Sequence, residues 1–185
     1  MEIDKSTRHS KITGDFAEAL VLYWLSKYGF ECARIDHTGI DLIANNLNTG
    51  ERFGISVKSR SRTEGQAKDA LYIPTREFAK VQFACEAFGC EPYFAIVIDA
   101  DNMIRGYILS MSDLKRLCPP TKANSYWKMG EKDQDTYLSD RAVKSFVLTA
   151  NTNRWWSGRG GGKNRTPRKP SRHHPKERKQ SNSGK

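Results

Sequence analysis

One acidic and one basic residue stand at matching ends of two neighbouring apolar segments of the sequence. Asp41 lies at the start of segment 40–44, and Lys58 lies at the end of segment 52–59. In an antiparallel hairpin the start of one strand lies beside the end of the next, so these side chains are expected to be neighbours. Such a pair predicts either a buried ion pair or half of a metal-dependent site that cleaves phosphodiester bonds.

The elements that must position this pair follow from the spacing of apolar residues and from turn and cap residues. The expected order is a loose segment over 1–12, a helix over 14–28, strands over 30–35, 40–44 and 52–59, a polar loop over 60–70, a short extended piece over 71–73, a helix over 74–88 that stops at Gly89, strands over 93–98 and 104–109, a short helix ending near Leu117, and a last strand over 142–148. The polar segment 121–140 has no assigned structure. This order predicts an α/β fold in which a mixed sheet is flanked by helices.

The first expected helix, over 14–28, is apolar nearly all round and is predicted to be well buried. Thr13 is a suitable N-cap for it. Glu18 falls on the face that also carries Leu22 and Leu25. A carboxylate among apolar neighbours on a buried helix needs a partner or a functional role.

Three short motifs lie on these elements, namely Gly14-Asp15-Phe16-Ala17-Glu18 on the first helix, Gly39-Ile40-Asp41-Leu42-Ile43 on a strand and Ser56-Val57-Lys58 on the next strand. In this order they resemble the PD-(D/E)XK nuclease superfamily, which has the restriction-endonuclease-like fold and includes archaeal Holliday-junction resolvases. The chain also looks like small uncharacterised prokaryotic members of that superfamily. The resemblance covers residues 12–117, about 100 residues.

The resemblance implies a site that hydrolyses DNA phosphodiester bonds with Mg²⁺ or Mn²⁺. Asp41 would be the main metal ligand, with the backbone carbonyl of Val57 as a further ligand. Glu18 would bind the metal directly or through water, and Lys58 would lie beside the attacking water and the scissile phosphate. The chemistry agrees with these residue types, because Mg²⁺ prefers oxygen ligands and needs only one or two carboxylates.

Ser56 is where the sequence departs from the superfamily pattern, which usually has Glu, Asp or Gln two residues before the lysine. Serine is a poor Mg²⁺ ligand and brings no charge. Glu77, which borders the buried stripe of the second helix, is the expected replacement and an expected metal ligand. Glu64 and Glu86 are further candidates. Ser56 and Glu77 therefore complete the predicted catalytic set of Asp41, Lys58 and Glu18.

Less specific interpretations of the same residues stay open. In one interpretation, Asp41 and Lys58 form an ion pair and have no catalytic role. In another, Glu77 only stabilises the N-terminus of its helix, because its negative charge interacts favourably with the helix dipole. If no replacement for the missing acid reaches the site, the chain is a catalytically degenerate nuclease-fold protein that binds nucleic acid through its basic C-terminal tail.

The positive charge of the chain is concentrated at its C-terminal end. Residues 1–150 contain 20 Lys and Arg and 20 Asp and Glu, whereas residues 151–185 contain 11 Lys and Arg and a single acid. We therefore expect a nuclease-like domain over 1–150 and a basic disordered tail over 151–185. The residues expected to bind nucleic acid are Arg60, Arg62, Arg154, Trp155, Trp156, Arg159, Lys163, Arg165, Arg168 and Lys169.

The expected partner is DNA, with RNA and a homodimer left open as alternatives. No apolar run is long enough to cross a membrane, and the four cysteines include no C-x-x-C pair. The sequence therefore predicts a soluble cytoplasmic protein with reduced thiols and no membrane partner.

Overall fold

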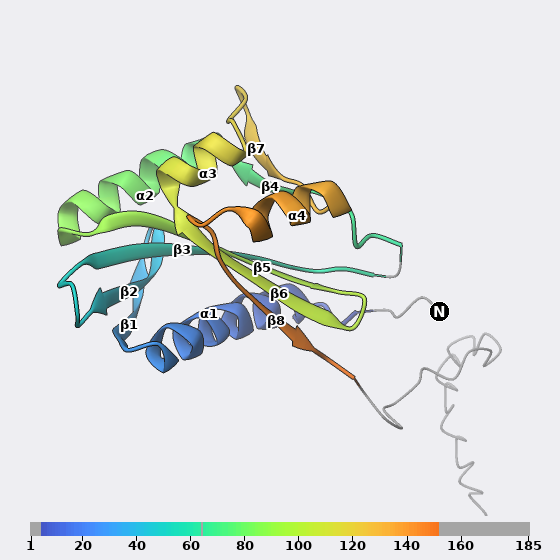
Figure 1. Cartoon of the computed structure of the whole chain (residues 1–185), viewed down its shortest axis with the longest axis horizontal. Helices are drawn as coiled ribbons and strands as arrows, with labels where there is room; N and C mark the ends of the chain where they lie inside the picture. Colours follow the sequence, from blue (N-terminus) through green and yellow to red (C-terminus); the bar gives the residue numbers. More distant parts are fainter. Residues whose placement is uncertain (1–4, 64, 152–185) are drawn as a thin grey trace, which may run out of the picture. The chain divides into compact units, whose positions relative to one another are not determined.

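The computed structural model describes residues 5–63 and 65–151 of the chain (Figure 1). Its elements, in chain order, are α1 (His9–Lys27), β1 (Phe30–His37), β2 (Ile40–Asn46), β3 (Arg52–Ser61), β4 (Leu71–Pro74), α2 (Thr75–Phe88), β5 (Glu91–Ala100), β6 (Met103–Ser110), α3 (Met111–Leu117), β7 (Asn124–Trp127), α4 (Glu131–Ser139) and β8 (Lys144–Thr149). The strands and the two long helices expected from the sequence are all present.

A six-stranded mixed sheet forms the centre of the fold, in the order β1-β2-β3-β5-β6-β8. β3 and β5 run parallel to each other, and the other neighbouring strands are antiparallel. The parallel pair requires a crossover, and the chain between the two strands contains α2. The expected mixed sheet flanked by helices is therefore confirmed.

Both faces of this sheet are covered by apolar side chains. On one face, Ala17 and Val21 of α1 pack with Leu42 and Ile55 of the sheet. The opposite face carries a larger cluster with residues of α2, α3 and β7, such as Trp127. Figure 1 shows α1 along one side of the sheet and α2 with α3 along the other. A strand buried on both faces reads as a continuous apolar run, which is the pattern of β5.

Two expectations for the first helix are wrong. The helix begins at His9 rather than at Gly14, and Thr13 lies inside it, where its hydroxyl donates to the His9 carbonyl at 2.8 Å. The helix is also not buried all round, because the side chains of Phe16 and Tyr23 are 46% and 55% exposed. α1 lies flat against the sheet, so only the side with Ala17 and its neighbours is covered.

The polar segment 121–140 contains structure that its composition did not predict. β7 pairs with β4 in a separate two-stranded sheet, and α4 follows it. Trp127 of β7 is fully buried and stacks on Tyr137 of α4, with ring centroids 3.8 Å apart. The eight tail residues expected to bind nucleic acid, from Arg154 to Lys169, lie outside the described residues.

None of the helices in the described ranges is both long enough and apolar enough to span a bilayer.

Candidate active site

Asp41 stands at the beginning of β2, beside the C-terminal half of β3. The last paired residues of these strands are Leu42 and Ile55, so Asp41 comes next to Ser56 across the two strands. The Asp41 carboxylate accepts the backbone N–H of Val57 at 2.6 Å, and the nearby Ser56 hydroxyl helps to lower the pKa of Asp41. Ser56 is only 1% exposed. Ser56 therefore lies beside Asp41, the acid expected to bind the metal.

Gly39 explains how the chain brings Asp41 to this position. Its φ is +114°, a conformation that favours glycine. A Cβ atom at this residue would lie 2.5 Å from the carbonyl oxygen of Lys80 in α2. β2 therefore begins directly against the backbone of α2, the helix that also carries Glu77.

Lys58 and Glu77 form an ion pair with a distance of 3.2 Å between Nζ and Oε2. Their side chains are 24% and 17% exposed, so the pair is partly shielded from water. The expected replacement acid thus comes to the site, but it binds the lysine. Lys58 forms its ion pair with Glu77 rather than with Asp41.

Lys80 is a neighbour of Glu77 that the sequence analysis missed. Its ammonium group lies 2.8 Å from Oε1 of Glu77, three residues earlier on the same helix. The i,i+3 spacing of opposite charges is a signal that could have found it. Burial alone would raise the pKa of Glu77, but hydrogen bonds and charges from Lys80 and Lys58 outweigh it and hold this pKa below its ordinary value. Glu77 is therefore ionised and well paired.

Glu18 and Asp41 have pKa values above their ordinary range. Burial is the largest cause for both carboxyls. The negative charge of Asp41 raises the pKa of Glu18 further, and the charge of Glu77 does the same to Asp41. Hydrogen bonds from Val57 and Ser56 and the charge of Lys58 act in the opposite direction on Asp41. The Asp41 carboxylate thus lies within electrostatic reach of both Glu18 of α1 and Glu77 of α2, and a nearby cation would lower the raised pKa values of Glu18 and Asp41.

The carboxylates do not form a closed metal cage. Across residues 5–63 and 65–151, no three His, Cys, Asp or Glu side chains lie close enough together to hold a metal ion. Mg²⁺ does not require such a cage, because one or two carboxylates suffice when waters and phosphate oxygens complete the shell. Asp41 and Glu18 are suitable Mg²⁺ ligands, because the negative charge of both carboxylates is poorly neutralised by the protein. Glu77 is less suitable, because it is already paired with two lysines.

The other residues singled out from the sequence have separate surroundings. Arg60 is exposed at the end of β3. The guanidinium of Arg62 donates to the carbonyls of Asp69 and Ala70 at 3.3 and 2.9 Å, so it ties down the loop after β3. Glu86 accepts a hydrogen bond from Gln82 on the exposed side of α2, and Glu64 is not among the described residues.

No family model and no curated protein matches this chain. Among solved structures, the chain is similar to the Holliday junction resolvase Hjc of Archaeoglobus fulgidus, an archaeal hyperthermophile. The sequence identity is 20%, with 64% of this chain and 91% of that chain covered, and the TM-score is 0.47. At this identity and TM-score, the match assigns no role to the residues of this chain. The chemistry of the site therefore depends on its own side chains.

Proposed function

We propose that this chain is a metal-dependent endonuclease that hydrolyses DNA phosphodiester bonds. The observation that carries the proposal is the position of Asp41 and Lys58 at one end of the β2–β3 pair, where Val57 holds Asp41 and Glu77 holds Lys58. Glu18 of α1 is near enough for the charge of Asp41 to raise its pKa. Poorly neutralised carboxylates beside a positioned lysine form the donor set that phosphodiester hydrolysis uses.

Asp41 and Glu18 would hold the cation in this proposal. A bound Mg²⁺ or Mn²⁺ would neutralise charge on the phosphate and lower the pKa of an attacking water. The hydrogen bond from the Val57 N–H would keep the Asp41 carboxylate in one orientation before substrate arrives. We assign the buried Ser56, which lies next to Asp41 across the strands, a positioning role rather than that of a metal ligand.

Lys58 would donate hydrogen bonds to a phosphate oxygen and to the attacking water. Its ion pair with Glu77 limits the directions that its flexible side chain can take. We assign Glu77 the task of positioning Lys58, which replaces its expected task as a metal ligand. A preorganised cation of this kind stabilises charge that develops in the transition state.

Cleavage assays on supercoiled, linear and branched DNA test the proposal, with Mg²⁺ or Mn²⁺ added and with RNA as a parallel substrate. We expect metal-dependent cutting that falls by more than about 10²-fold in Asp41→Asn and Lys58→Ala. Glu86→Gln changes an exposed acid of α2 and serves as the control. Cutting that persists in both site variants would overturn the assignment, and cutting of RNA alone would change the substrate class.

A second candidate is a degenerate nuclease fold that binds nucleic acid without cutting it. It is favoured by the buried Ser56 in place of an acid and by the missing three-ligand cage among the described residues. It predicts binding to DNA with no cleavage under any metal. Calorimetric titration with Mn²⁺ separates the two candidate functions. If the wild type binds the metal and Asp41→Asn does not, this second candidate is contradicted.

A further inference from the structure

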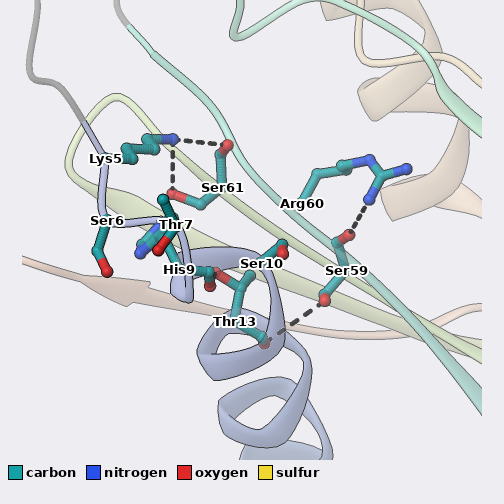
Figure 2. A pocket seen from close by; sticks show the side chains of 9 residues that line it. All are labelled: Lys5, Ser6, Thr7, His9, Ser10, Thr13, Ser59, Arg60 and Ser61. Atoms are coloured by element: carbon teal, nitrogen blue, oxygen red, sulfur yellow. Dashed lines mark hydrogen bonds between the residues drawn. The ribbon is translucent and has the colours of Figure 1, made fainter.

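A pocket of about 270 Å³ lies between the start of α1 and the end of β3 (Figure 2). Its lining consists of one lysine, one arginine, one histidine and six serine or threonine residues. None of these side chains is a carboxylate or a large apolar group. A hollow lined by cations and hydroxyl groups suits a ligand with several negatively charged oxygens.

Two contacts build the pocket from separate segments of the chain. Lys5, before α1, donates from Nζ to the carbonyl oxygen of Ser61 at 2.8 Å and to its hydroxyl at 3.1 Å. The hydroxyl of Ser59 donates to the carbonyl oxygen of Thr13 at 3.4 Å. Figure 2 shows these contacts bridging the two walls. The segment before α1 is thus fixed to β3, and the Lys5 charge is held at the rim.

The start of α1 lacks the side chains that usually neutralise a helix N-terminus. Its N-cap, Arg8, makes no capping hydrogen bond through its side chain, and no acid stands in the first turn. The Nε2 atom of His9 is buried and has no hydrogen-bond partner in the described structure. A buried polar atom without a partner costs free energy, which an acceptor oxygen from a ligand would recover. The positive end of the helix dipole favours an anion at the same place.

We propose that this pocket binds a phosphate group of a nucleic-acid strand next to the phosphate that is cleaved. The inference rests on the proposed function, because Arg60 in the pocket wall follows Lys58 by two residues on β3. Two residues of a strand span about 6.6 Å. A nucleic-acid strand that follows β3 from Lys58 to Arg60 would therefore reach the wall of the pocket. The phosphate is either an internal diester or a terminal monoester of that strand.

Fluorescence anisotropy with 3′-labelled DNA in EDTA tests the pocket without any cleavage. The variants are Lys5→Gln, which keeps a hydrogen-bond donor near Ser61, and Arg60→Ala. The control is Lys132→Ala, which removes one charge from α4, on the opposite side of the sheet. We expect each pocket variant to weaken binding several-fold and to reduce the slope of log K against log salt by about one, and the control to change neither. Pocket variants that behave like the control, or a wild type that does not bind, would overturn the proposal.

Single neutral methylphosphonate linkages, moved along the strand, and a 5′-phosphate compared with a 5′-hydroxyl identify the phosphate. An internal diester is indicated if one neutral linkage weakens DNA binding by the wild type but does not weaken DNA binding by Lys5→Gln. A monoester is indicated if the 5′-phosphate strengthens wild-type binding and not Lys5→Gln. If neither modification distinguishes wild type from variant, the pocket does not bind phosphate. Absence of cleavage by the wild type with metal would contradict the proposed function and leave these binding results unaffected.

Discussion

Among the single residues of the site, Asp41 combines burial with the nearby negative charge of Glu77. Its raised pKa means that the folded protein holds this carboxylate in ionised form at a cost. Such a cost is typical of functional sites, where stability is given up for chemistry.

Asp41→Asn is expected to raise the Tm of the metal-free protein at neutral pH while it abolishes cleavage. The asparagine oxygen can still accept the Val57 N–H, and the cost of ionisation is gone. A gain of about 1 kcal/mol would correspond to about 2–4 °C in a chain of this size. Calorimetry in EDTA measures the shift.

The pH dependence of that shift has a definite sign. Because the folded-state pKa of Asp41 lies above its unfolded value, the cost of ionisation is present above the folded pKa and vanishes below the unfolded one. The Tm difference between variant and wild type should therefore shrink as the pH falls through the acidic range. A difference that grows on acidification would contradict this account of Asp41.

Glu77 offers a test of positioning at the same scale. We expect Glu77→Gln to lower kcat by about 10²-fold with little change in KM, because Lys58 loses the partner that directs it. Lys80→Ala removes the other lysine from Glu77 and should cost much less. Partial recovery in Glu77→Asp would support positioning. An increase in KM alone in Glu77→Gln would instead indicate a role in binding.

At the scale of elements, the close approach of β2 to α2 at Gly39 sets the geometry of the site. Gly39→Ala combines an unfavourable positive φ with a clash against the Lys80 backbone. Gly29→Ala is a matched control, since Gly29 also has a positive φ of 86° but no atom within 4 Å of the added Cβ. We expect about 1 kcal/mol of destabilisation in the control and clearly more in Gly39→Ala. If urea unfolding shows the same loss of unfolding free energy in both variants, the contact between Gly39 and α2 contributes nothing to stability.

The sequence predicted the elements whose signals are local. The turn at Gly39 and the apolar runs around it placed Asp41 and Lys58 at neighbouring strand ends, because hairpin pairing follows from short-range pattern. The αL glycine at the end of α2 was equally readable. The ion pair between Lys58 and Glu77 was not predictable, because it depends on how α2 is rotated over the sheet.

Non-local pairing explains the remaining gaps in the prediction. β7 finds its partner, β4, about 50 residues earlier in the chain, and Trp127 is buried only because α4 and the sheet cover it. The start of α1 was missed because its N-cap, Arg8, gives no capping signal in the sequence. Tertiary contacts decide such segments, and no local pattern records them.

For the molecule as a whole, the charge imbalance between residues 1–150 and 151–185 predicts a division of tasks. A chain that ends at Asn151 keeps every described element, including β8 and the bond from the Ala150 N–H to Asn102. We expect it to retain kcat at saturating DNA, to bind DNA more weakly, and to show a salt slope smaller by several units. Anisotropy and cleavage assays on both chains measure this. A salt slope equal to that of the full chain would show that the tail does not bind DNA.

The parallel pairing of β3 with β5 has a consequence for the chain during synthesis. All five residues of the proposed site, from Glu18 to Glu77, have been made before β5 begins at Glu91. Until β5 emerges, the edge of β3 that carries Lys58 and Arg60 has unpaired backbone groups, and such an edge can pair with another chain. A nascent chain halted at Gly89 would then be prone to aggregate, and ribosomal delay in this region would reduce the yield of folded protein.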